Sequence, residues 1–549
     1  MTAKIESVNG VPTIVINGTP IPEIAYITYV LEKNHYKDFS DVGIKLYSVN
    51  LNFSEMAINE RAPVLVFQKG IFEGDTPDFS IVDRNFDQIL NACPDAYIFP
   101  RVNMNLSESW EKAHKDELCE KGFNERKRFS YASDIWAEEV KRELCLLVNY
   151  VENSKYKDRV IGYQLAAGNT EEWLAVDPQS GYGARAKEKF FEYCEKNKRE
   201  KTPENYYGFM SELITDRING FGAEVKRLTN RNKLVGAFYG YTLFVGREQC
   251  HNALCKILSC DDVDFLCSPI SYAEGRAACI DPYAMVPTAS LRLHGKLYFS
   301  ENDIRTHLSK PVDDHPNYTL PIWYGHEKEI TLEQLKLSFC RAMLYGYGMW
   351  WFDMWGGWYD DPDYMSLMKK MRELCQDGMD VPDSEVAAFI DEKAVTKGVS
   401  GGVPMTMKSV REIGLCGAPC DMYLMSDFEE VFDKYKAFIF IEPAETELSH
   451  RCAKKALSSD KAIKRFTVGS EISAEDIRQW LKDSLCNVSV NRNAVVYRGK
   501  KHVMLYTAED GEYDFCDNGK RSFTDLFSGE KFEFPTRLKK AKCLLFERG

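Results

Sequence analysis

Two short segments of the sequence combine carboxyl groups with neighbours suited to acid–base chemistry. Residues 168–173 contain Glu171 and Glu172, and residues 299–306 contain Glu301. Cleavage of a glycosidic bond needs two carboxyl groups that flank the bond. One holds a proton for the departing oxygen, and the other is ionised and attacks the anomeric carbon. Each segment alone is explained as well by a glutamate in a surface loop, but the two together favour this chemistry.

The two roles require different surroundings, because one carboxyl group must keep its proton while the other stays ionised. Arg305 lies close to Glu301 in the sequence and would favour its ionised form. Trp173 adjoins Glu172 and is an apolar neighbour that could raise its pKa. We therefore expect Glu301 to be the nucleophile and Glu172 the general acid/base, with Glu171 as the alternative for the second role.

The elements that must position these residues follow one repeating pattern. Short apolar runs, rich in branched and aromatic residues, alternate with helical patterns over ~350 residues, as in a (β/α)8 barrel. An N-terminal β-hairpin is predicted before it from the turn dipeptides Asn9-Gly10 and Asn17-Gly18. The predicted barrel strands are residues 24–29, 44–50, 96–102, 160–167, 234–239, 263–270, 296–299 and 348–353.

The candidate carboxyl groups follow the fourth and the seventh predicted strands. In this fold the active site is built from the loops that follow the carboxyl ends of the strands. The longest predicted insertions, 103–131, 170–201 and 271–295, also follow strand ends. We therefore expect the two groups to meet across the barrel mouth, where a retaining glycosidase holds them about 5–5.5 Å apart.

Other residues of the same rim could bind a sugar, by hydrogen bonds to its hydroxyls or by aromatic packing against its ring. They follow strands three, four, seven and eight, and a role in loop stabilisation or core packing competes with each. Asn169 could reach the sugar 2-OH, a contact that strengthens in the transition state. The predicted substrate-binding residues are Arg101, Asn103, Trp110, Asn169, Glu171, Trp173, Arg305, Trp323, Asp353, Trp355 and Trp358.

The sequence pattern changes twice after the barrel. Residues 381–487 again alternate apolar runs with helical stretches and predict a compact α/β unit. Residues 488–549 alternate with a period of two between turn signals and predict a small antiparallel β domain. The predicted organisation is therefore a barrel with its hairpin over residues 1–380, an α/β domain and a C-terminal β domain.

Composition argues against several kinds of partner. The net charge of −13 disfavours nucleic acid and acidic membrane surfaces. The 17 cysteines are scattered without a CxxC pair, which favours free thiols in a reducing compartment. No stretch approaches the ~20 apolar residues of a membrane span, and no signal-peptide core opens the sequence. We expect a cytoplasmic protein that needs no metal and no cofactor.

The sequence resembles clan A glycoside hydrolases, in particular the family 42 β-galactosidases and the related β-mannosidases. The resemblance rests on the carboxylates after strands four and seven and on residues 387–392 and 419–424, which look like the start of that family's second domain. It implies a retaining exo-β-glycosidase acting on a terminal β-linked hexose, a flavodoxin-like second domain and a homotrimer. Clan A enzymes normally end strand four with Asn-Glu, whereas here Asn169 precedes Thr170, Glu171 and Glu172.

Two other classes of protein are also consistent with the sequence. A carbohydrate-binding protein could keep the barrel without catalysis, because a fold does not establish an activity. A metal-dependent isomerase on an unrelated barrel is the second alternative. The presence of both carboxyl groups favours the glycosidase, with an oligosaccharide or another glycoside as its substrate.

Overall fold

The computed structural model describes residues 1–58, 66–74, 76–119, 128–168, 170–175, 183–309 and 321–549. The chain opens with an antiparallel sheet of β1 (Ala3–Val8), β2 (Val11–Ile16) and β3 (Thr19–Pro20). At each turn the Asn and Gly both have positive φ: 54° and 87° at Asn9-Gly10, and 49° and 84° at Asn17-Gly18. These values fit the tight turns that join twisted strands, so the predicted hairpin is confirmed.

The main sheet is a closed barrel of eight parallel strand positions. The second and third positions are each interrupted, so that β5 and β6 form one and β9 and β10 form the other. Pairing of β15 with β4 closes the ring. The barrel predicted from the sequence is confirmed. Its strands are β4 (Ile24–Ile27), β5 (Leu46–Tyr47), β6 (Asn50–Asn52), β9 (Tyr97–Ile98), β10 (Arg101–Asn103), β11 (Gly162–Ala166), β12 (Leu234–Phe238), β13 (Phe265–Pro269), β14 (Leu297–Asn302) and β15 (Gly348–Phe352).

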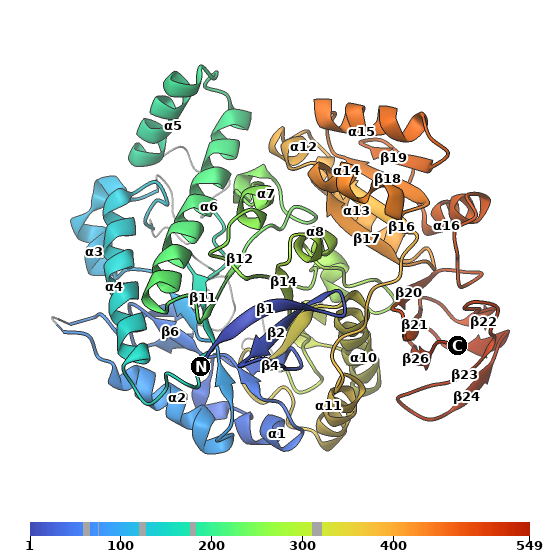
Figure 1. The fold of residues 1–549 in the computed structure, drawn as a ribbon, viewed down its shortest axis with the longest axis horizontal. Helices are drawn as coiled ribbons and strands as arrows, with labels where there is room; N and C mark the ends of the chain where they lie inside the picture. The colour runs from blue at the N-terminus through green and yellow to red at the C-terminus, as the bar shows by residue number, and fades with distance from the viewer. Residues whose placement is uncertain (59–65, 75, 120–127, 169, 176–182, 310–320) are drawn as a thin grey trace.

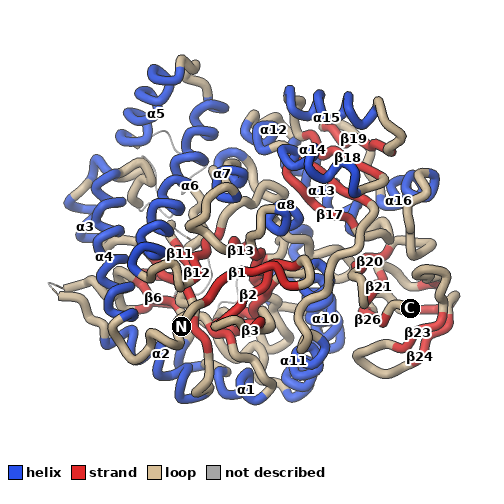
Figure 2. Tube along the Cα trace, in the orientation of Figure 1, coloured by secondary structure: helices blue, strands red, loops and turns tan. Residues whose placement is uncertain are grey.

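Helices surround the barrel strands (Figures 1 and 2). The longest, α6 (Pro203–Leu228), starts where the Thr202 hydroxyl accepts a hydrogen bond from the Asn205 N–H and where proline occupies the first helical position. The other helices of this region are α1 (Tyr36–Asp41), α2 (Ser80–Ala92), α3 (Glu108–Ala113), α4 (Asp134–Glu152), α5 (Ala184–Asn197), α7 (Leu254–Leu258), α8 (Thr288–Leu293), α9 (Pro321–Tyr324), α10 (Lys328–Tyr345) and α11 (Pro362–Leu374). In the described part of the chain, no helix is both long enough and apolar enough to cross a bilayer.

A second parallel sheet follows the barrel, with strand order β17-β16-β18-β19. This is the 2-1-3-4 order of flavodoxin-like domains, as the resemblance predicted. Its strands are β16 (Val386–Ile390), β17 (Cys420–Leu424), β18 (Ala437–Glu442) and β19 (Ala462–Thr467). Its helices are α12 (Glu392–Thr396), α13 (Gly402–Gly414), α14 (Phe428–Val431), α15 (Glu447–Leu457) and α16 (Ala474–Asp483).

The C-terminal region is antiparallel and lies beside the second sheet in Figure 1. Three strands, β20 (Ala494–Arg498), β21 (His502–Thr507) and β26 (Cys543–Glu547), form its main sheet in the order β20-β21-β26. Two short strand pairs pack with it: β22 (Gly511–Tyr513) with β25 (Thr536–Leu538), and β23 (Ser522–Thr524) with β24 (Lys531–Glu533). This confirms the antiparallel β region that the period of two predicted.

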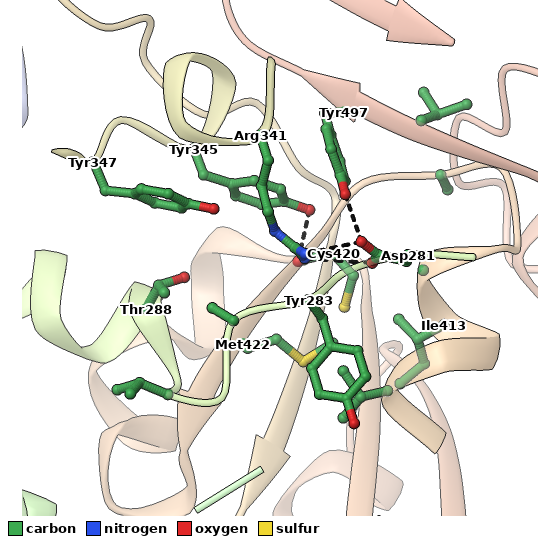
Figure 3. Close-up of a pocket in the computed structure, with 16 residues that line it drawn as sticks. Asp281, Tyr283, Thr288, Arg341, Tyr345, Tyr347, Ile413, Cys420, Met422 and Tyr497 are labelled. Atoms are coloured by element: carbon green, nitrogen blue, oxygen red, sulfur yellow. Dashed lines mark hydrogen bonds and ion pairs between the residues drawn. The ribbon is translucent and has the colours of Figure 1, made fainter. Parts of the chain in front are cut away.

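A buried ionic cluster joins all three regions of the chain (Figure 3). Arg341 of α10 donates from Nη1 and Nη2 to the two carboxylate oxygens of Asp281, at 2.9 and 3.3 Å. The Tyr497 hydroxyl of β20 donates to the same carboxylate. Gly414, at the end of α13, approaches so closely that a Cβ there would lie 2.2 Å from Asp281 Oδ2. The barrel, the second sheet and the C-terminal sheet therefore meet on one carboxylate.

Removal of this carboxylate charge should destabilise the whole chain. In Asp281→Asn, the buried Arg341 guanidinium loses its counter-charge, and breaking a buried pair in this way costs about 3–5 kcal/mol. Differential scanning calorimetry should show a clearly lower Tm. The matched control is Asp41→Asn, which removes an exposed pair with Lys37 worth about 0–1 kcal/mol. Equal melting of Asp281→Asn and the unmodified protein would contradict this account of the junction.

Candidate active site

Glu301 occupies the carboxyl end of β14, inside the barrel mouth. Its Oε2 accepts hydrogen bonds from Arg101 Nη2 at 2.8 Å and from Trp350 Nε1 at 3.2 Å. Trp350 is the residue of β15 that pairs with Glu301 in the sheet register, so neighbouring strands bring the two together. Arg101 reaches Glu301 from β10, on another part of the barrel wall.

Glu171 is held by the same arginine. Arg101 Nη1 donates to its Oε2 at 3.2 Å, and the Tyr29 hydroxyl donates to that oxygen at 3.0 Å. The other oxygen accepts from the side-chain amides of Asn50 and Asn103, at 2.7 and 3.0 Å. Glu171 is therefore a buried carboxylate with two donors on each oxygen. One guanidinium joins it to Glu301.

Glu172, the next residue of the loop after β11, faces a cavity. Glu171 and Trp173 have left-handed backbone conformations, with φ of 65° and 60°, and Glu172 stands between them. Glu172 Oε1 accepts a hydrogen bond from the Tyr241 hydroxyl at 2.8 Å. It lines a cavity of about 560 Å³, whose wall also includes Tyr241, Tyr272, Phe244, Arg305, Trp323, Met354 and, from α13 of the second sheet, Val403.

Burial sets the protonation of both candidate carboxyl groups. It raises the pKa of Glu301 to about 7, against the lowering effect of Arg101, while the negative charges of Asp303 and Glu172 raise it further. Burial also raises the pKa of Glu172, against the lowering effects of the neighbouring Thr170 and Tyr241 side chains. The two groups repel each other when both are ionised, so the negative charge of Glu172 adds to the raised pKa of Glu301.

Two expectations about the neighbours of these carboxyl groups are wrong. The cation that contacts Glu301 is Arg101, whereas Arg305 donates to the Asp303 carboxylate at 2.8 Å. Trp173 is fully buried, donates from Nε1 to the Leu165 carbonyl and stacks on Tyr131, so its indole lies in the packing outside the barrel wall. The pKa of Glu172 is therefore raised by burial at the cavity and not by Trp173.

Apart from Glu171 and Trp173, described above, the predicted sugar-binding residues fall into three groups: residues at the site, one residue outside the described part of the chain, and residues whose contacts favour structural roles. Arg101 and Asn103 lie beside the carboxylates, and Arg305 and Trp323 line the cavity. Asn169 lies outside the described residues.

The third group makes contacts that favour structural roles. Trp110 donates to Glu139 and stacks on His114, apart from the residues that line the cavity. Asp353 is fully buried and accepts hydrogen bonds from the Gly357 and Trp358 amides and the Tyr26 hydroxyl, which fixes the loop after β15. Trp355 packs on Tyr29, and Trp358 lies under the Arg305 guanidinium.

Several residues of the site escaped the sequence analysis. No role was predicted for Trp350, Tyr29, Asn50, Tyr241 and Tyr272. Tyr29, Asn50 and Tyr241 stand at or just after the carboxyl ends of strand positions one, two and five. The rule that this rim carries the site would have selected them, had it been applied to the ends of strands one, two and five as well.

Comparison with known proteins identifies the architecture. No protein-family model matches the sequence, and no curated protein matches it. A β-galactosidase from the psychrophilic Marinomonas ef1 superposes with a TM-score of 0.67 at 10% identity, covering 96% of this chain and 100% of that chain. A family 42 β-galactosidase from G. stearothermophilus gives 0.63 at 10% identity, with coverage of 96% and 98%. A family 42 exo-carrageenase from Bacteroides ovatus gives 0.59 at 11% identity, with coverage of 100% and 84%.

The chain therefore has the fold of the family 42 glycoside hydrolases, and the resemblance predicted from the sequence is confirmed for the fold. Within that class, the β-galactosidases match it over nearly the full length of both chains. Among the residues that the structure describes, no group of three or more His, Cys, Asp or Glu side chains is arranged to hold a metal ion.

Loss of the central arginine should produce a pH-dependent loss of stability. In Arg101→Met, Glu171 and Glu301 are buried without a cation, so the folded-state pKa of Glu301, already raised by burial, rises further above its unfolded value. The stability that protonated Glu301 contributes is present below pH ~4.5 and is lost as pH rises through its folded pKa. We expect a penalty of about 3–5 kcal/mol at pH 8 that shrinks toward pH 5.

Thermal melting across pH 5–8 tests this expectation. The control is Arg142→Met, which removes a largely exposed pair with Glu139. Its penalty should be small and nearly independent of pH, because exposed pairs contribute about 0–1 kcal/mol. A penalty for Arg101→Met that is equal at pH 5 and pH 8 would contradict the proposed electrostatic role.

Proposed function

We propose that the protein is a retaining β-glycosidase that removes a terminal β-linked hexose, with Glu301 as nucleophile and Glu172 as general acid/base. The observation that carries this proposal is the pair of glutamates after strands four and seven, in contrasting surroundings. Glu301 binds to a guanidinium and an indole N–H, whereas Glu172 faces the cavity with a raised pKa.

The proposed reaction proceeds by double displacement. A carboxylate oxygen of Glu301 forms a bond to the anomeric carbon while the bond to the leaving oxygen breaks, and Glu172 donates its proton to that oxygen. In the second step, Glu172 takes a proton from a water molecule, whose oxygen attacks the anomeric carbon and releases Glu301. Arg101 and Trp350 orient the nucleophile, and the Tyr241 hydroxyl orients the acid.

Glu171 is less suited to the acid/base role. Two donors occupy each of its oxygens, and all of those donors favour the ionised form. A general acid needs an oxygen that is free to hold a proton beside the leaving group. We propose that Glu171 instead fixes Arg101, Asn50 and Asn103 at the base of the site.

Other parts of the proposal rest on the resemblance. The β-galactosidases among the structural neighbours favour galactose over mannose as the sugar removed. We further propose a cytoplasmic homotrimer, with domains over residues 1–380, 381–487 and 488–549. Light scattering of the purified protein at micromolar concentration tests the oligomeric state, and a monomeric mass would exclude the trimer.

Substitution of each glutamate should give a distinct kinetic result on aryl β-glycosides. Glu301→Gln should lower kcat by more than ~10³-fold on every substrate, because the nucleophile is lost. Glu172→Gln should lower it by ~10²–10⁴-fold with poor leaving groups and much less with nitrophenol leaving groups, which need little protonation. The control is Glu23→Gln, a buried glutamate with a raised pKa at the amino end of β4.

The results also separate the alternatives. Full activity in Glu301→Gln would refute the assignment of the nucleophile. Equal losses on good and poor leaving groups in Glu172→Gln would transfer the acid/base role to Glu171 or elsewhere. If the unmodified protein binds galactosides without turning over any aryl glycoside, the carbohydrate-binding alternative holds.

The pH profile gives a further test of Glu301. Activity needs its ionised form, so kcat/KM should fall as pH drops below about 7. Trp350→Phe removes the indole N–H that stabilises this form, and should move the acid limb upward by roughly 0.5–1 pH unit. Trp136→Phe is the matched control, because the buried indole nitrogen of Trp136 has no hydrogen-bond partner among the described residues. An unchanged acid limb in Trp350→Phe would contradict the assignment of that limb to Glu301.

A further inference from the structure

A second ionic cluster lies beside the cavity and carries an excess of positive charge. Arg305 Nη1 donates to Asp303 Oδ2 at 2.8 Å and to the Asp303 carbonyl at 3.0 Å. Arg276 Nη1 forms an ion pair with the other carboxylate oxygen of Asp303. One carboxylate therefore faces two guanidinium groups, all three of them buried.

The two arginines differ in how their remaining donors are used. Arg276 donates from Nη2 to the Ile270 carbonyl at 3.0 Å and from Nε to the Ser271 carbonyl at 3.4 Å, and its guanidinium packs on Tyr272. Arg305 Nη2 contacts only the Met354 sulfur, at 3.9 Å, within the described part of the chain. A thioether is a weak acceptor. Arg305 thus lines the cavity with a charged donor, Nη2, that meets no oxygen of the residues that the structure describes.

The cluster around Glu301 has the opposite charge balance. There, Arg101 stands between two carboxylates, Glu171 and Glu301, which leaves an excess of one negative charge when both are ionised. A site of this kind suits positive charge that develops at the anomeric carbon. The cluster of Arg276, Asp303 and Arg305 would instead stabilise a negative charge elsewhere on the same substrate.

We propose that the sugar bound in this cavity carries an anionic substituent, a sulfate ester or a carboxylate, that pairs with Arg305. This inference rests on the glycosidase function proposed above. A guanidinium presents a planar fork of donors that matches the oxygens of either group. Burial lowers the pKa of Arg305, as expected for a cation whose charge the protein only partly balances. The guanidinium also lies over the rings of Trp323 and Trp358, 5.8 and 5.2 Å from their centroids.

The test compares matched substrates. The kcat/KM values of the unmodified protein are measured on a neutral aryl β-galactoside, on its monosulfate esters and on the corresponding aryl β-uronides. We expect at least one anionic substrate to be preferred by about 10- to 100-fold, the range expected for one charged hydrogen bond. The sulfate and uronide series distinguish the two possible sources of the charge.

Variants of Arg305 show whether this residue causes the preference. In Arg305→Met, kcat/KM should no longer be higher for anionic than for neutral substrates. Arg305→Lys should keep part of the preference, because lysine keeps the charge but lacks the planar fork of donors. Arg305→Gln serves if Arg305→Met fails to fold, as judged by circular dichroism. The proposal would be overturned if the unmodified protein preferred neutral substrates, or if Arg305→Met kept the same ratio of kcat/KM between anionic and neutral substrates. Either result would leave the glycosidase function intact.

A binding measurement separates failure of the substrate proposal from failure of the function. Calorimetric titration with galactose and its monosulfates, and with galacturonate, requires no turnover. Binding of an anionic sugar that Arg305→Met loses would support the charge recognition even if no aryl glycoside were hydrolysed. Equal affinity for neutral and anionic sugars would overturn it.

Discussion

The site depends on one buried guanidinium. Arg101 lies between Glu171 and Glu301, and it is the only cation that contacts either carboxylate within the described part of the chain. Burial raises the pKa of Glu301, and Arg101 is the main neighbour that lowers it. The guanidinium also lies over the rings of Phe238 and Phe352, 4.7 and 5.4 Å from their centroids, so aromatic side chains of the barrel interior pack around the charge. The ionised form of Glu301 therefore depends on side chains that several strands contribute to the barrel interior.

The two adjacent glutamates of the loop after β11 show how backbone geometry assigns different environments. Positive φ at Glu171 and Trp173 turns the chain sharply on both sides of Glu172. As a result Glu171 is buried among four donors, while Glu172 faces the cavity and a single tyrosine hydroxyl. Such backbone conformations are uncommon for residues other than glycine, and their presence here fits a site whose geometry is fixed by its surroundings.

The parts of the chain outside the barrel also contribute to the site. Val403 of α13 lines the cavity, so the second sheet borders the place where a substrate would bind. The buried contacts of Asp281 with Arg341 and Tyr497 hold the barrel against the C-terminal sheet. Because a buried ion pair is costly to break, this junction ties the C-terminal sheet to the barrel.

The sequence by itself determined the barrel, the α/β region that follows it and the rim positions of Glu172 and Glu301, because hydrophobic periodicity and strand ends are local properties of the chain. It could not pair Arg101 with Glu301, which are 200 residues apart, and it gave that role to the nearby Arg305. It also placed Trp173 at the site, although its ring packs outside the barrel. Barrel closure decides which side chains meet, and loop φ angles decide where they point. Both depend on long-range packing, which sequence spacing does not encode.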